Sequence, residues 1–266
     1  MHNADPVLLA QDSRGVATLT LNRPERRNAF DDTLIGRLHG AITQLANDRS
    51  VRIVVLTGAG TAFCAGMDLD HMRRQGTQSE VENKTDALLL ARCLQTLDRL
   101  DKPVIARVNG GAYGGGLGLI ACADIAIGTS TAKFALTEVR LGIVPAVISP
   151  YILRAIGERE ARRWFLSGAA FSANKAEQIG LLHEVREPTA LDAAVEDEIA
   201  SLLKGGPKAQ GEAKALAQEV ARMGSITDES AVEYTAELLA RLRASSEGQE
   251  GLAAFNERRT PSWCGK

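Results

Sequence analysis

Residues 110–118 hold six glycines in a nine-residue segment that follows an apolar run typical of a strand and precedes a run typical of a helix. Glycine has no Cβ and adopts positive φ freely, so the backbone here can approach a ligand closely. Free N–H groups at a helix N-terminus, where the dipole favours negative charge, can then point at an oxygen. This segment is suited to stabilising an oxyanion that develops during a reaction.

A second loop of small residues follows another predicted strand. Residues 52–57 are typical of a buried strand, and residues 63–69, Phe-Cys-Ala-Gly-Met-Asp-Leu, follow it. Two such loops can supply two N–H donors to one oxygen. Glu138 lies downstream of the glycines. A carboxyl group can deliver or remove a proton at carbon, and it does so best where burial raises its pKa toward the working pH.

The elements that must position these loops alternate along the chain. Residues 14–22 predict a strand, and Asp31 or Asp32 can cap a helix whose apolar stripe precedes the strand at 52–57. Further on, the pattern predicts a helix over 80–100, a strand over 103–108, a helix that opens at the glycines and a strand over 124–128. This alternation indicates a parallel α/β core. The apolar stripe of the first helix consists of Leu34, Ile35, Leu38, Ile42 and Leu45.

The last quarter of the chain has helical spacing only. The predicted helices span 191–203, 208–223, 228–244 and 247–258, and Gly224-Ser225 separates the second helix from the third. We therefore expect a core over residues 1–190 and a helical oligomerisation region over 191–266. The apolar faces of these helices need cover from the core or from another subunit.

Composition narrows the class of protein. The 31 Lys and Arg residues nearly balance the 33 Asp and Glu residues, so the net charge of −2 gives no support to a nucleic-acid or membrane-surface partner. The segment 1–11 is unlike a secretory or transit peptide, and the apolar stretch 117–127 is interrupted by Asp124. The four cysteines form no Cys-x-x-Cys pair, which speaks against a zinc site or a disulfide framework. We expect a cytoplasmic protein.

Seven segments, taken in their order along the chain, resemble the crotonase superfamily, the enoyl-CoA hydratase/isomerase proteins. The resemblance implies an α/β fold, the crotonase (ClpP-like) β-β-α superhelix with a C-terminal helical extension, assembled into trimers or hexamers. It implies acyl-CoA thioester substrates without a separate cofactor, since CoA is part of the substrate, and no metal. The segments that carry the resemblance are 19–24, 63–69, 102–104, 109–110, 114–116, 137–142 and 248–255.

The resemblance also implies roles for individual residues. It places the oxyanion donors at the backbone N–H groups of Ala65 and Gly115 and the catalytic carboxylate at Glu138. The second catalytic glutamate of the hydratases falls at Gly118, which has no side chain. A glutamate placed there is expected to restore the pair, provided that it fits. The residues implied to bind CoA are Arg27, Ala29, Ala65, Gly66, Met67, Asp68, Leu69, Tyr113 and Gly114.

Two segments refine the substrate prediction. Residues 118–122 and 143–150 most resemble bacterial methylglutaconyl-CoA hydratases of leucine degradation, and nearly as much the isohexenylglutaconyl-CoA hydratases. We therefore predict hydration of methylglutaconyl-CoA through an enolate, with isohexenylglutaconyl-CoA or a general enoyl-CoA hydratase/isomerase as the alternatives. Arg140 is a candidate partner for the distal carboxylate of a glutaconyl group, against the commoner reading of a solvated arginine.

Other readings stay open at this point. Residues 116–121 satisfy Gly-x-Gly-x-x-Ala, as in dinucleotide-binding folds, but the first of these glycines does not directly follow the strand. Glu138 could pair with Arg140, Asp68 could simply cap a helix, and His71 has no ligand-like spacing. Cys64 as a nucleophile would need a base beside it. A catalytically silent or RNA-binding relative is the non-enzyme alternative.

Overall fold

The computed structural model describes residues 5–223 and 229–264. Its larger sheet has six strands in the order β1-β2-β3-β5-β7-β10. The β1–β2 pair is antiparallel and the other neighbouring pairs are parallel, which confirms the predicted parallel core. The strands are β1 (Val7–Gln11), β2 (Val16–Leu21), β3 (Ile53–Gly58), β5 (Val104–Val108), β7 (Ile125–Thr129) and β10 (Glu184–Arg186).

A second sheet of short strands lies beside the first. It has the order β4-β6-β8-β9, and each of β4, β6 and β8 follows directly on a strand of the larger sheet. Two strands, one in each sheet, followed by helices form the repeating β-β-α unit of the predicted crotonase fold. Strands of two or three residues are too short to show alternation, so the sequence does not reveal them. They are β4 (Ala62–Cys64), β6 (Gly111–Tyr113), β8 (Lys133–Ala135) and β9 (Phe171–Ser172).

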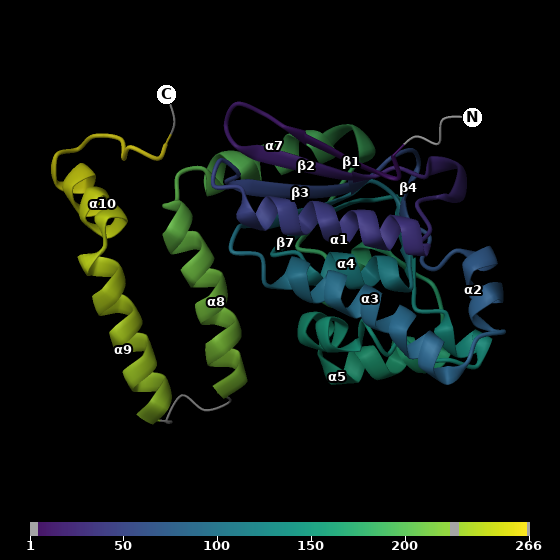
Figure 1. The fold of residues 1–266 in the computed structure, drawn as a ribbon. Helices are drawn as coiled ribbons and strands as arrows, with labels where there is room; N and C mark the ends of the chain where they lie inside the picture. Colours follow the sequence, from purple (N-terminus) through teal and green to yellow (C-terminus); the bar gives the residue numbers. More distant parts are fainter. Residues whose placement is uncertain (1–4, 224–228, 265–266) are drawn as a thin grey trace.

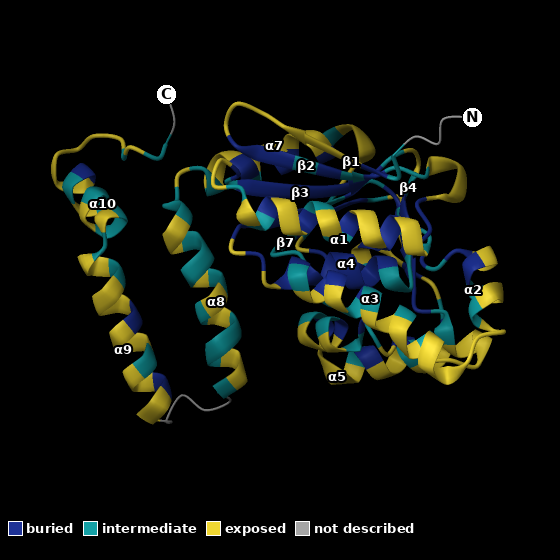
Figure 2. Ribbon diagram, in the orientation of Figure 1, coloured by how far each residue is buried: buried dark blue, intermediate teal, exposed yellow. Residues whose placement is uncertain are grey.

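Helices cover one face of the larger sheet (Figure 1). The predicted stripe of α1 (Asp32–Asn47) is buried throughout, and the Asp31 carboxylate accepts the Leu34 N–H as its N-cap. The α1 helix packs against α3 (Glu80–Asp98), and α4 (Gly115–Cys122) lies in contact with α3 and α5 (Ser149–Ser167). Figure 2 shows α4 as a buried helix at the centre of this layer.

Helix α7 (Leu191–Leu202) lies on the opposite face of the sheet. Its residues Leu191, Val195 and Ile199 join a buried cluster with Ile53 and Ile105 of β3 and β5. The first helix after residue 190 is therefore packed on the core. The helices that stand beside the core are α8 (Pro207–Met223), α9 (Glu229–Ala244) and α10 (Ser246–Asn256) (Figure 1). The predicted break at Gly224-Ser225 and the predicted helix start at Asp228 lie outside the described residues.

Polar contacts join this helical region to the core. Lys214 Nζ of α8 donates to Asp124 Oδ2 at 2.9 Å, and Gln218 Nε2 donates to the Asp98 carbonyl at 3.0 Å. No helix in the described ranges has the length and apolar character needed to cross a bilayer. The remaining helical elements are α2 (Leu69–Gln75), α6 (Ala173–Gln178) and the 3-10 turns η1 (Pro24–Arg26), η2 (Glu138–Leu141) and η3 (Pro188–Ala190).

Candidate active site

The two glycine-containing loops meet, as the sequence predicts. They follow β4 and β6, which are parallel neighbours, so both loops leave the same edge of the smaller sheet. Gly66 has φ +85°, and a Cβ there would lie 2.8 Å from the Tyr113 carbonyl oxygen. A Cβ at Gly116 would lie 2.8 Å from Cys64 Cβ. Glycine is required at both positions because the backbones of the two loops are in contact.

A cavity of about 420 Å³ opens beside these loops. The loops themselves, helices α2 and α3 and the segment 137–148 contribute its walls. Most of the lining is apolar, which excludes water and strengthens electrostatic effects inside. Its apolar members include Phe30, Leu69, Met72, Leu90, Leu141 and Ile148. Its polar side chains are Gln75, Asn83, Asp86, Tyr113, Thr137 and Glu138.

One predicted oxyanion donor is wrong. The Ala65 N–H donates to the Arg27 carbonyl at 2.9 Å, so it is not free for a substrate. Further along the same loop, the Phe30 N–H donates to the Gly66 carbonyl, and the Phe30 carbonyl accepts from the Asp68 N–H. Met67 lies between Gly66 and Asp68, and its N–H has no acceptor among the described residues. Met67 also lines the cavity and is therefore the better donor.

The second predicted donor, the N–H of Gly115, remains a candidate. Gly115 opens α4, so its N–H belongs to the first turn, whose amides have no intrahelical acceptor. A Cβ at this position would lie 2.8 Å from the Phe30 ring, which explains why a glycine is needed. The free amides of Met67 and Gly115 thus border one cavity.

Glu138 begins the turn η2 and lies over Gly114, where a Cβ would be 3.1 Å from Glu138 Oε1. Its Oε2 atom is buried and has no hydrogen-bond partner among the described residues. Burial raises the pKa of the Glu138 carboxyl, against a smaller opposing effect of a hydrogen bond from its own backbone. Arg140 turns away, since a Cβ at Gly168 would lie 3.0 Å from Arg140 Nε. The reading of Glu138 as an ion-pair partner of Arg140 is therefore not supported, and Arg140 is not part of the described lining.

The raised pKa predicts the acid limb of the pH profile. A general base must be ionised, so kcat/KM should rise with pH through a pKa above the ordinary 4.5 of a glutamate and level off beyond it. Initial rates from pH 4 to pH 9 measure this, with far-UV circular dichroism at each pH as the control for acid unfolding. An acid limb at or below 4.5, in folded protein, would contradict the assignment.

The place of the missing second carboxylate is filled. A Cβ at Gly118 would lie 2.4 Å from Ile148 Cγ2 and 3.0 Å from Ile148 Cβ. Both residues are buried, and Ile148 lines the cavity. The condition attached to a glutamate at position 118, that its side chain fits, is not met in this packing, because Ile148 already occupies that space.

The residues predicted to bind CoA divide into two groups. Arg27 is exposed in a left-handed conformation, Ala29 is buried, and neither lines the cavity. Asp68 is buried and acts as the N-cap of α2, where it also pairs with Arg23 at 3.3 Å, so its predicted capping role is confirmed. The predicted residues that do line the cavity are Ala65, Gly66, Met67, Leu69, Tyr113 and Gly114.

Sequence reasoning missed a polar cluster at the cavity wall. His71 is buried between Asp32 and Asp86, and the ligand-type atoms of the three lie within 4.8 Å of one another. The three residues come from α2, α1 and α3, so no sequence spacing could indicate the cluster. His71 Nε2 lies 3.3 Å from Asp86 Oδ2, and His71 Nδ1 lies 3.4 Å from an Arg74 guanidinium nitrogen and 3.5 Å from Asp32 Oδ1, so both ring nitrogens have polar neighbours.

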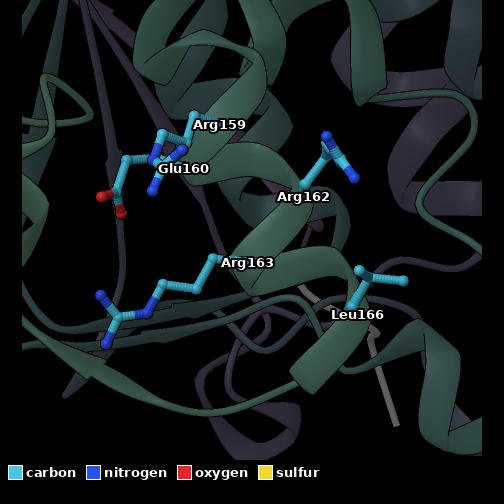
Figure 3. Close-up of a pocket in the computed structure, with 5 residues that line it drawn as sticks. All are labelled: Arg159, Glu160, Arg162, Arg163 and Leu166. Atoms are coloured by element: carbon cyan, nitrogen blue, oxygen red, sulfur yellow. The ribbon is translucent and has the colours of Figure 1, made fainter.

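Two other features carry no chemistry. Cys64 is fully buried, and burial raises the pKa of its thiol to about 12, which removes it as a nucleophile. A hollow of about 500 Å³ on α5 is lined by Arg159, Glu160, Arg162, Arg163 and Leu166 (Figure 3). All its lining side chains come from the single helix α5, so it offers no convergent amides and no buried acid.

Comparisons with known proteins agree with this fold. The enoyl-CoA hydratase/isomerase family model matches residues 11–266. A 2,3-dehydroadipyl-CoA hydratase of Escherichia coli is 33% identical over 97% of this chain and 99% of that protein. An enoyl-CoA hydratase structure from Shewanella pealeana has a TM-score of 0.93 at 40% identity and covers 97% of this chain and 96% of its own. One from Mycobacterium smegmatis has a TM-score of 0.89 at 34% identity, covering 97% and 98%.

The fold, the paired glycine-containing loops and the half-buried glutamate define a crotonase-type enzyme, whose class acts on acyl-CoA thioesters. The chain belongs to the enoyl-CoA hydratase/isomerase family and is an enzyme of the hydratase type, a carbon-oxygen lyase.

Proposed function

We propose that the enzyme adds water to a 2-enoyl-CoA whose acyl chain is uncharged. The observation that carries the proposal is the unpartnered, buried oxygen of Glu138 on the same apolar cavity as the free amides of Met67 and Gly115. The thioester carbonyl oxygen would accept hydrogen bonds from both amides. No cofactor is needed, because the substrate carries CoA.

The chemistry follows from where charge develops. Attack of water on C3 moves an electron pair onto the thioester oxygen, and two fixed N–H donors stabilise this enolate more than the ground state. Glu138 removes the proton of the attacking water as the C3–O bond forms. The enolate then collapses, and the same carboxyl returns the proton to C2, so that water is added overall and Glu138 is regenerated.

The single carboxylate favours a second activity. A base that removes a proton from C2 of a 3-enoyl-CoA and returns it to C4 shifts the double bond without water, and it needs only one acid/base group. Gly118 has no side chain and Ile148 fills the space beside it, so no second carboxylate stands at that position. The other carboxylate of the described lining, Asp86, comes from helix α3. Double-bond isomerisation is therefore the second candidate activity.

The lining of the cavity supports an uncharged acyl group. Among the described residues the lining holds no lysine, arginine or histidine that could pair with a distal carboxylate. A buried carboxylate without such a partner is costly. Methylglutaconyl-CoA and isohexenylglutaconyl-CoA, the substrates predicted from the sequence, carry a distal carboxylate and are therefore the competing substrate class. Leucine degradation and a cytoplasmic location remain predictions from the sequence. The name of the Escherichia coli relative shows that the family includes dicarboxylic acyl groups.

A substrate panel tests the proposal. Crotonyl-, hex-2-enoyl-, hex-3-enoyl-, 3-methylcrotonyl-, methylglutaconyl- and isohexenylglutaconyl-CoA would be compared by kcat/KM, with the products separated by mass spectrometry. Highest activity on an uncharged 2-enoyl-CoA supports the proposal. Preference for methylglutaconyl- or isohexenylglutaconyl-CoA would overturn the proposed substrate class, and no turnover of any of these thioesters would overturn the function.

We further propose that the C-terminal helices mediate assembly into trimers or hexamers. Phe255 and Leu252 of α10 are 81% and 52% exposed, and Leu239 of α9 is 49% exposed. Burying such side chains between subunits contributes about 1.5–3 kcal/mol each. A closed ring of identical contacts would cover them all.

Replacing Phe255 with aspartate is expected to shift the protein from trimer or hexamer to monomer. Light scattering coupled to size exclusion measures the mass. Val81→Asp is the matched control, because Val81 is 75% exposed on a different helix, α3. A monomeric wild type at micromolar concentration, or an F255D variant with unchanged mass, would contradict the proposed interface.

A further inference from the structure

The polar cluster lies at the cavity wall that α2 and α3 form. Asp86 of α3 faces the cavity, and its Oδ2 accepts from Gln75 Nε2 and lies 3.3 Å from His71 Nε2. His71 is only 3% exposed, and its Nδ1 lies 3.5 Å from Asp32 Oδ1. The carboxylate of Asp86 is thus held in one place by contacts from α2.

The charged side chains that line the cavity are acidic. In the described part of the chain, Asp86 and Glu138 are the charged side chains on the cavity lining. The guanidinium of Arg74 is exposed and lies 3.4 Å from His71 Nδ1, the ring nitrogen that does not face Asp86. Burial, and next a hydrogen bond with Asp86, raise the pKa of Asp32. The two carboxyl groups are therefore close neighbours, and Asp86 is the one of the two that lines the cavity.

We propose that Asp86 is a specificity-determining residue that excludes acyl groups with a distal carboxylate and admits neutral ones. This inference deepens the proposed function and rests on it. A second carboxylate in the cavity would lie near two acids in an apolar surrounding, where like charges repel strongly. Selectivity of this kind arises from a repulsive element aimed at the wrong ligand. A neutral tail suffers no such repulsion, and a hydroxyl at its end can donate to Asp86.

Binding measurements with two saturated ligands of equal length test this role. Hexanoyl-CoA and adipyl-CoA differ in the group at the distal end, a methyl in one and a carboxylate in the other. We expect the wild type to bind hexanoyl-CoA about a hundredfold more tightly by isothermal titration calorimetry. Asp86→Asn removes the charge and keeps an acceptor for His71 and Gln75, so the ratio of the two Kd values should shrink about tenfold.

Two further variants sharpen the test. Glu80→Gln changes an exposed acid on the same helix that does not line the cavity, so its ratio should equal that of the wild type. Gln75→Lys places a cation beside Asp86 and should tighten adipyl-CoA binding about tenfold. This variant keeps the inference testable if Asp86→Asn does not fold.

The outcomes separate the inference from the proposed function. Equal wild-type affinities for the two ligands, or a ratio that neither Asp86→Asn nor Gln75→Lys alters, would overturn the role of Asp86. Binding needs no turnover. The expected selectivity in a protein that hydrates no enoyl-CoA would overturn the proposed function alone.

Discussion

Replacing Glu138 with glutamine is expected to lower kcat by about 10²–10⁴-fold while CoA affinity changes little. Glutamine keeps the size of the side chain but cannot take a proton from water or return one to carbon. The neutral amide also removes a charge that burial disfavours, because burial raises the pKa of Glu138. The variant should therefore unfold at a higher temperature than the wild type at neutral pH, where the native carboxylate is ionised.

Single-turnover rates, CoA titration and thermal unfolding measure these three effects together. Glu80→Gln is the control, since Glu80 is an exposed acid at the start of α3. Near wild-type turnover in Glu138→Gln would show that Glu138 is structural. A loss of turnover together with a lower Tm would point to damage to the fold and would leave the catalytic assignment unsupported.

Replacing Gly118 with glutamate is expected to destabilise the protein by about 3 kcal/mol or more and to leave crotonyl-CoA hydration no faster. Overpacking of a core costs about 1–3 kcal/mol, and a buried carboxyl group without partners adds to that cost. The contact responsible is the 2.4 Å approach of a Cβ at position 118 to Ile148 Cγ2. Urea unfolding measures the stability of wild type and variant.

Smaller changes isolate the same contact. Gly118→Ala should destabilise, although alanine in a helix is ordinarily favoured over glycine by about 1 kcal/mol. Gly36→Ala in α1 is the matched control, because a Cβ at Gly36 meets nothing within 4 Å, and it should stabilise slightly. Adding Ile148→Ala to Gly118→Ala should recover part of the loss, as a double-mutant cycle would show. A stable, more active Gly118→Glu variant would refute the steric reading.

The sequence was sufficient for the elements with a long, regular pattern. The stripe from Leu34 to Leu45 predicts α1 correctly, and the apolar runs at 52–57 and 103–108 predict β3 and β5. Asp68 as a helix cap and Glu138 as a candidate acid/base also follow from local chemistry and motif order. The short strands β4, β6, β8 and β9 could not be found, because they depend on pairing between distant segments.

By itself, the sequence determined the fold class, the two glycine-containing loops that meet and the identity of the candidate carboxylate. Only the tertiary structure decided which backbone amide is free. The Arg27 carbonyl accepts the N–H of Ala65, whereas the N–H of Met67 has no acceptor among the described residues. It also decided that Ile148 fills the space beside Gly118 and that Asp86 reaches the cavity. The physical reason is common to all three: the partner of an amide, a Cβ or a carboxylate comes from a segment far away in the chain, and its identity depends on how helices and strands pack.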